Sequence, residues 1–125
     1  MEPPKRVQPL IGIVGVCASG KTTLLAQLQQ LGYSCRHIAQ EHSYVQNMWQ
    51  RLTNPDILIY LDASYAITLV RRNLNWTLQE YAQQVERLAH ARANADILVE
   101  TDDLTPEQVC QEVQKRILAL TSRPE

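Results

Sequence analysis

The chain has 125 residues, of which 45% are hydrophobic, so it has room for one domain with a modest core and none for a second. Its formal net charge is −1 and it contains no block of like charges, which excludes a general attraction to nucleic acid or to anionic membrane surfaces. Its three cysteines, Cys17, Cys35 and Cys110, are widely spaced, and their spacing matches no metal-binding motif. This usage favours a reducing compartment, so we predict a cytoplasmic protein.

The first predicted element is a buried strand over residues 10–14, because an uninterrupted apolar run ends there at a glycine. Residues 15–22, GVCASGKT, follow directly, and leucines at helical spacing then predict a helix over residues 21–31 that ends at Gly32. A glycine-rich loop that leaves a buried strand and enters a helix through Gly-Lys-Thr is the P-loop, or Walker A, pattern. The alternative interpretation is a glycine-rich turn that precedes a lysine by coincidence.

The P-loop interpretation gives each residue type in the loop a role. Gly15 and Gly20 allow backbone N–H groups to turn inward around phosphate, and the helix N-terminus adds unpaired N–H groups and a positive dipole end. Lys21 can reach the β- and γ-phosphates of ATP, and the Thr22 hydroxyl can ligate Mg²⁺. We expect Lys21 to lie over an open loop and Cys17 to be a small filler residue. The predicted nucleotide-binding residues are Gly15, Val16, Cys17, Ala18, Ser19, Gly20, Lys21, Thr22 and Thr23.

The rest of the chain alternates strands with helices. Strands are predicted over residues 34–39, 57–61 and 97–99, and helices over residues 43–52, 64–72, 77–94 and 105–120. Capping residues predict the starts of the last three helices: Ser64, Thr77 with Glu80 in a capping box, and Thr105. This alternation predicts a three-layer α/β fold, in which a four-stranded parallel sheet carries helices on both faces. A nearest-neighbour arrangement of the strands would give the order 2-3-1-4. We expect one domain over residues 10–121, a flexible N-terminal tail over residues 1–9 without an apolar leader, and a short tail over residues 122–125.

Two later segments carry a resemblance to a known family. Residues 55–63, PDILIYLDA, lead into a helix that ends with Arg71-Arg72, and residues 95–102 are ADILVETD. Together with the P-loop, these segments resemble the P-loop kinases of nucleotides and small metabolites, such as thymidylate, shikimate and dephospho-coenzyme A kinases. The resemblance implies the P-loop NTPase fold with the strand order 2-1-3-4, which we favour. It also implies a lid in which Arg71 binds the nucleotide and Arg72 is catalytic, whereas the alternative for both arginines is a solvated helix end.

Polar residues follow the later strands at the carboxyl edge of the predicted sheet, where such sheets bind ligands. Thr101 can contact a nucleotide there. Asp62 and Glu41 each follow a strand beside the P-loop strand, so either carboxylate can support Mg²⁺, and we favour Asp62 because its strand is more regular and more apolar. The alternatives are a helix N-terminal carboxylate for Asp62 and a solvated loop charge for Glu41, and His42 is expected to be a surface histidine.

The chain departs from the family pattern in the interval over residues 42–55, where the related kinases have a strand and substrate-binding helices. It therefore resembles a kinase without its acceptor-substrate region. One hypothesis is an ATP-binding protein with magnesium-dependent phosphoryl transfer to a small-molecule acceptor, or slow hydrolysis. The other is a non-catalytic nucleotide-binding module that regulates a protein partner or a homodimer. A GTP switch is a weaker third hypothesis, because the sequence has no Asn-Lys-x-Asp guanine motif.

Overall fold

The computed structural model describes residues 9–71 and 75–121. The elements in chain order are β1 (Leu10–Gly15), α1 (Lys21–Gln30), β2 (Ser34–His37), the short 3-10 helix η1 (Gln40–His42), α2 (Met48–Leu52), β3 (Ile57–Asp62), α3 (Tyr65–Arg71), α4 (Leu78–Arg87), α5 (Ala89–Asn94), β4 (Ile97–Glu100) and α6 (Pro106–Thr121). Apart from Pro9, the tails predicted over residues 1–9 and 122–125 lie outside the described residues. Among the helices described, none is both long enough and apolar enough to cross a bilayer.

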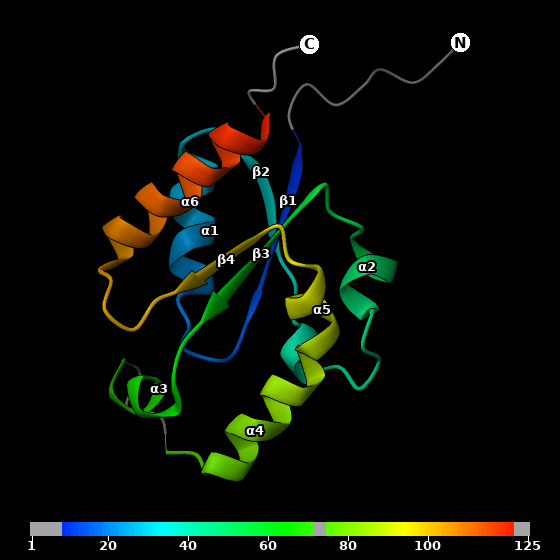
Figure 1. Ribbon diagram of the computed structural model, residues 1–125, viewed down its shortest axis with the longest axis vertical. Coiled ribbons are helices and arrows are strands. Elements are labelled where there is room, and N and C mark those ends of the chain that lie inside the picture. The colour runs from blue at the N-terminus through cyan, green and yellow to red at the C-terminus, as the bar shows by residue number, and fades with distance from the viewer. Residues whose placement is uncertain (1–8, 72–74, 122–125) are drawn as a thin grey trace.

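The four strands form one parallel sheet in the order β2-β1-β3-β4. This confirms the predicted α/β class and the order 2-1-3-4, and excludes the nearest-neighbour order 2-3-1-4. β1 lies inside the sheet, where Ile11 pairs with Cys35 of β2 on one side and with Ile57 of β3 on the other. The loop that leaves β1 therefore starts from the interior of the sheet, and α3 lies beyond the carboxyl ends of the strands (Figure 1).

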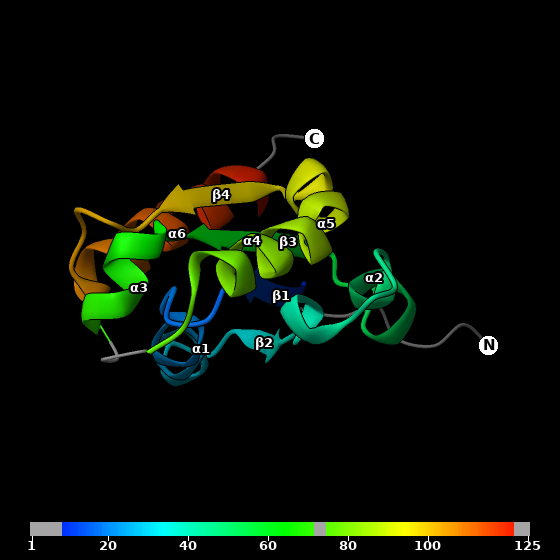
Figure 2. The same cartoon turned by 90° about the horizontal axis from the view of Figure 1, so that it is seen from below.

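Alternate residues of the strands face opposite layers, as expected for a sheet buried on both sides. Ile11, Ile13 and Ile59 belong to the core that α1 and α6 cover. Val14 and Tyr60 belong to the second core, which α2, α4 and α5 cover. Figure 2 shows the strands lying between these two groups of helices. The protein thus has three layers, and the carboxyl edge of the sheet lies at one end of them.

The N-terminal caps predicted from sequence are confirmed. Thr77 and Glu80 form the capping box that opens α4. At α6, Thr105 Oγ1 accepts the N–H of Gln108 at 3.1 Å, and Gln108 Oε1 accepts the N–H of Thr105 at 2.9 Å. Ser64 Oγ accepts a backbone N–H of α3 at 3.3 Å. Local polar chemistry therefore fixes the starts of these three helices.

The helix predicted over residues 43–52 is shorter than expected, since α2 begins only at Met48. The reason is the carboxamide of Gln40, which is fully buried. Its Nε2 donates to the carbonyl of Val45 at 2.8 Å, and its Oε1 accepts the N–H of Trp49 at 2.8 Å. This side chain gives the backbone of Val45 and Trp49 the hydrogen-bond partners that a helical turn would otherwise provide. The residues before Met48 therefore need not be helical.

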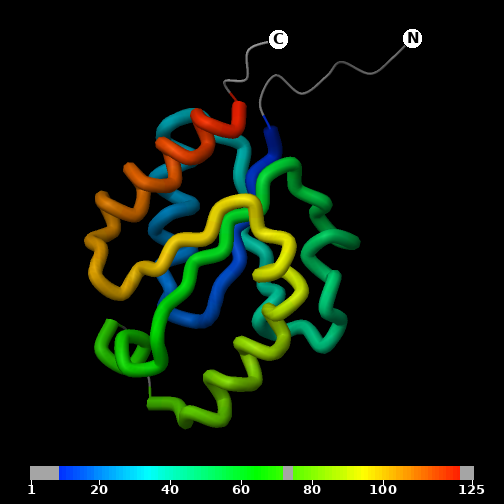
Figure 3. The backbone as a smooth tube through the Cα atoms, in the orientation of Figure 1, coloured from blue at the N-terminus to red at the C-terminus, as the bar shows by residue number. Residues whose placement is uncertain are grey.

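The helix predicted over residues 77–94 is divided into α4 and α5 at Leu88 (Figure 3). The N–H of Leu88 is shared between the carbonyls of Gln84 and Val85, at 3.1 and 3.2 Å. Sharing between the fourth and third preceding carbonyls tightens the turn locally. The apolar stripe remains continuous across this junction, because Leu88 itself is fully buried. Periodicity alone therefore predicted one helix where the backbone forms two.

Candidate functional site

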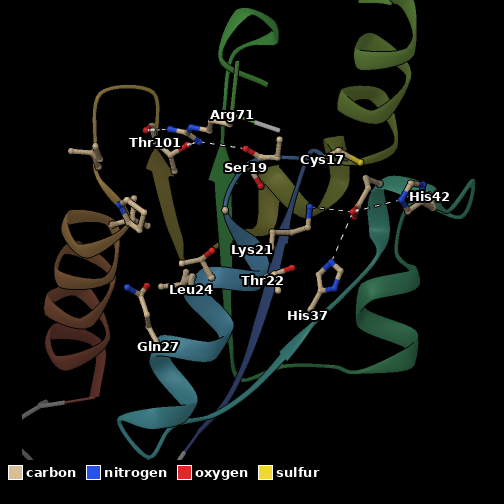
Figure 4. Close-up of a pocket in the computed structure, with 17 residues that line it drawn as sticks. Cys17, Ser19, Lys21, Thr22, Leu24, Gln27, His37, His42, Arg71 and Thr101 are labelled. Atoms are coloured by element: carbon tan, nitrogen blue, oxygen red, sulfur yellow. Dashed lines mark hydrogen bonds and ion pairs between the residues drawn. The ribbon is translucent and has the colours of Figure 1, made fainter. Parts of the chain in front are cut away.

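A cavity of about 620 Å³ opens at the carboxyl edge of the sheet, which is within the usual range for small-molecule sites. Its walls come from the loop after β1, the start of α1, η1, the end of α3 and the segment after β4 (Figure 4). The lining residues are Cys17, Ala18, Ser19, Gly20, Lys21, Thr22, Thr23, Leu24, Gln27, His37, Glu41, His42, Arg71, Thr101, Leu104, Pro106 and Val109. The structure thus gathers most of the predicted site residues around one space.

The glycine-rich loop, residues 15–22, contains a close backbone contact and a left-handed conformation, both of which favour glycine. A Cβ at Gly15 would lie 2.5 Å from the backbone oxygen of Leu61, so the strand end can pack this closely only with glycine. Gly20 has a φ of 103°, and Ala18 also adopts the left-handed region with a φ of 65°. Such conformations turn successive N–H groups toward one side of a loop. Gly15 and Val16 themselves are buried at the base of the loop and are not in the cavity wall.

Lys21 is 6% exposed, so the expectation that it lies over an open loop is wrong. Its ammonium donates to the backbone oxygens of Gly15 and Val16 at 2.6 and 2.9 Å. It also forms an ion pair with Glu41 Oε2 at 3.1 Å. The side chain curls back because these three acceptors together replace the water that a buried ammonium loses.

Glu41 is 3% exposed, so the interpretation of this residue as a solvated loop charge is wrong. Its Oε2 forms the ion pair with Lys21. The same oxygen lies 3.9 Å from the Nε2 atoms of both His37 and His42, as the dashed lines in Figure 4 show. Burial, and next the charge of Lys21, lower the pKa of His37, although the Glu41 carboxylate opposes this shift. The other oxygen, Oε1, is buried and has no hydrogen-bond partner within the described residues.

Asp62 lies apart from this cluster and is not among the residues that line the cavity. Its Oδ2 is 3.7 Å from Arg92 Nη2 of α5, and the side chain is 30% exposed. The backbone oxygen of Asp62, by contrast, accepts both the N–H and the hydroxyl of Thr101, at 2.8 and 2.9 Å. The two carboxylates that we considered for the metal therefore occupy different surroundings, and only Glu41 faces the cavity.

Arg71, at the end of α3, reaches across to the loop after β4. Its Nη1 donates to Thr101 Oγ1 at 2.8 Å and to the backbone oxygen of Ala18 at 3.5 Å, and its Nη2 donates to the backbone oxygen of Thr101. The guanidinium is thus held at the cavity rim rather than free in solvent. Arg72, which we predicted to be catalytic, lies outside the described residues.

Gln84 of α4 supports the loop but was not predicted from sequence. It is 6% exposed, its Oε1 accepts the N–H of Cys17 at 2.9 Å, and its Nε2 donates to Cys17 Sγ at 3.1 Å. Cys17 therefore has a defined polar partner and borders the cavity, which is more than a filler residue would show. A signal was present in the sequence, because Gln84 is a polar residue within the apolar stripe formed by Tyr81 and Leu88.

The cavity combines groups that suit an anion with groups that suit a hard cation. The N-terminus of α1, the loop N–H groups, Lys21 and Arg71 favour phosphate or another polyanion. The exposed hydroxyls of Thr22 and Thr23 and the carboxylate of Glu41 are oxygen ligands of the kind that Mg²⁺ prefers. Comparison of the chain with models of known protein families gave no match, and comparison with curated proteins gave none either.

The burial of the Lys21–Glu41 pair predicts strong coupling between the two residues. Lys21→Met leaves the carboxylate buried without its cation, so we expect the free energy of unfolding to fall by about 3–5 kcal/mol. Adding Glu41→Gln should restore much of this loss, because the double variant contains no buried unpaired charge. Urea unfolding of the wild type, both single variants and the double variant measures the coupling. Lys115→Met, which removes an exposed lysine of α6, is the matched control, and additive penalties would contradict the prediction.

Proposed function

We propose that the chain is an ATP-binding protein with the P-loop NTPase fold, related to small-molecule kinases, that performs magnesium-dependent phosphoryl transfer or slow hydrolysis. The observation that carries the proposal is the glycine-rich loop, which joins the buried strand β1 to α1 below a cavity of about 620 Å³. Backbone N–H groups, the positive end of α1 and Lys21 together provide what a chain of phosphates requires. The cysteine usage and the charge balance support a cytoplasmic protein without nucleic-acid or membrane partners.

Lys21 and Glu41 suggest why nucleotide and metal would bind together. If phosphate draws the Lys21 ammonium away, Glu41 is left as a buried carboxylate without its cation, which is costly. A bound Mg²⁺ supplies positive charge for both the phosphates and the carboxylate. Thr22 and Glu41 are the residues that would hold it, and the buried, unpartnered Oε1 of Glu41 fits this role. We therefore propose that the nucleotide binds tightly only with its metal.

For the metal-supporting carboxylate we now prefer Glu41 to Asp62. Glu41 lines the cavity, whereas Asp62 is paired with Arg92 beside α5. An acidic group can hold a metal-bound water only where it can reach the phosphates, so placement decides between the two. The preference for Asp62 from the sequence depended on the regularity of its strand. That is a weaker argument than placement at the cavity.

Catalysis in this proposal comes from positioning and charge, which is typical of phosphoryl transfer. Lys21 would neutralise the phosphates from the loop side. Arg71, held at the rim by Thr101, would bring a second positive charge from the end of α3. The catalytic assignment of Arg72 remains a prediction from the family resemblance.

The second candidate function is a non-catalytic module that reports nucleotide binding to a protein partner or a second copy. One observation favours it: between η1 and β3 the described chain holds a single short helix, α2. Trp49 of α2 is 5% exposed and belongs to the core beneath α5. This segment therefore packs on the sheet, and among the residues described it does not line the cavity.

Magnesium-ATP should raise the thermal stability of the protein. A ligand that binds only the folded state stabilises it by RT ln(1 + [L]/Kd), which is about 2.7 kcal/mol at a hundredfold excess over Kd. Lys21→Met should abolish most of the shift, because Lys21 is the only lysine among the described residues that line the cavity. Differential scanning fluorimetry with and without ATP measures this, with Lys115→Met as control. An undiminished shift in Lys21→Met would remove the loop from the binding site.

Glu41→Gln should weaken magnesium-dependent ATP binding by roughly 10–100-fold, because it removes the charge that supports the metal and keeps the shape. Asp62→Asn should have a smaller effect. Titrating ATP into both variants by calorimetry, once with Mg²⁺ and once with a chelator, separates metal-dependent from metal-free binding. A larger magnesium-specific loss in Asp62→Asn would return the assignment to that residue.

Kinase activity on common nucleoside monophosphates and on shikimate should be absent or very weak. The described segment between η1 and β3 offers no acceptor pocket at the cavity, so much of a proximity advantage of about 7–11 kcal/mol is lost. Phosphate release and transfer, measured against a metabolite panel, test this. Turnover near about 10 s⁻¹ on any such substrate would contradict the prediction, and no turnover of any kind would favour the non-catalytic module.

A further inference from the structure

Three side chains with different donor atoms meet at one rim of the cavity: the thiol of Cys17, the carboxylate of Glu41 and the imidazole of His42. Their ligand atoms all lie within 4.8 Å of one another. Cys17 comes from the glycine-rich loop, whereas Glu41 and His42 are neighbours in η1. Figure 4 shows Cys17 and His42 side by side at the edge of the cavity. The pairing of β1 with β2 brings these two segments together.

This donor set is not one that Mg²⁺ would select, because magnesium prefers oxygen ligands in octahedral geometry. One sulfur, one nitrogen and one oxygen suit a borderline ion, and Zn²⁺ is the common example. With bonds of about 2.0–2.3 Å, the ligands of a tetrahedral zinc ion are about 3.3–3.8 Å apart. The distances between these ligand atoms, at most 4.8 Å, exceed that spacing by up to about 1.5 Å, which side-chain rotation can supply.

Two independent observations indicate that the cluster is prepared for a ligand. Glu41 is 3% exposed, and its Oε1 is buried without a hydrogen-bond partner among the residues described, a condition that is costly unless something else satisfies it. Gln84 fixes the position of Cys17, because its Oε1 accepts the Cys17 N–H and its Nε2 donates to Cys17 Sγ at 3.1 Å. A hydrogen bond to the sulfur of this kind orients a metal-binding thiol.

We propose that Cys17, Glu41 and His42 form a binding site for Zn²⁺ or a similar borderline divalent ion at the rim of the phosphate cavity. The thiol loses its proton on binding, so sulfur coordinates as a thiolate and one proton is released for each ion. Three protein ligands leave the fourth position of a tetrahedral ion to water. Lys21 lies 3.1 Å from Glu41 and repels a cation, so the site is weaker than a closed structural zinc site.

The metal site does not depend on nucleotide binding. Its regulatory consequence rests on the proposed function, because an ion held here takes Glu41 away from magnesium-ATP. The test therefore uses metal alone, so that a failure of the zinc site and a failure of the nucleotide site remain distinguishable.

Titration of the full chain with Co²⁺ reports thiolate ligation through a sulfur-to-cobalt absorption band in the near ultraviolet. Displacement by Zn²⁺ gives the zinc affinity, and excess Mg²⁺ should displace nothing. We expect one ion per chain, a lost band in Cys17→Ala and at least about tenfold weaker zinc binding in both Cys17→Ala and His42→Asn. Cys110→Ala and His90→Asn, which alter the same residue types away from the cavity, should bind as the wild type does.

Absence of the band in the wild type, its retention in Cys17→Ala, or an equal loss in the two control variants would overturn the proposal. Circular dichroism of each metal-free variant checks that it is folded. If Cys17→Ala does not fold, His42→Asn decides the question, because the His42 side chain is 61% exposed and its replacement should leave the fold intact.

Discussion

The buried ion pair between Lys21 and Glu41 joins the two halves of the site. Lys21 opens α1 and Glu41 belongs to η1, so the pair ties the segment after β1 to the segment after β2. Each charge is tolerated inside the protein because the other is there. A ligand that engaged one partner would have to compensate the other, so the pair would favour ligands that bring both signs of charge. A phosphate chain with its metal meets that condition, and a simple anion does not.

The position of each acidic residue within its strand or turn decides which role is open to it. Along β3, Leu61 belongs to the core under α1 and α6, while Tyr60 belongs to the core under α2, α4 and α5. Side chains alternate along a strand, so Asp62 lies on the same face of the sheet as Tyr60. Its carboxylate therefore lies beside α5 and pairs with Arg92. The chain enters η1 shortly after the end of β2. Glu41 in η1 therefore lies close to the glycine-rich loop and pairs with Lys21.

Sequence patterns predicted the features that depend on local chemistry. Apolar runs located the strands, Thr77 with Glu80 located the start of α4, and the family resemblance gave the strand order that the structure confirms. The features that were missed depend on side-chain contacts between different elements of the fold. The burial of Glu41 depends on Lys21, and the late start of α2 depends on the buried amide of Gln40, so neither follows from periodicity. The α/β class and the strand order were therefore predictable, but the burial and ion pairing of the charged side chains were not.

The central position of β1 affects how the protein is made. β1 is synthesised before β2 and β3 but lies between them, so one of its edges has no partner until residues 57–62 have left the ribosome. An apolar strand with a free edge is a template for pairing with other chains. Incomplete products that stop before β3 should therefore be prone to aggregation. The backbone oxygen of Leu61, against which Gly15 packs, is also synthesised after the glycine-rich loop, so the nascent loop takes its final shape only once β3 exists.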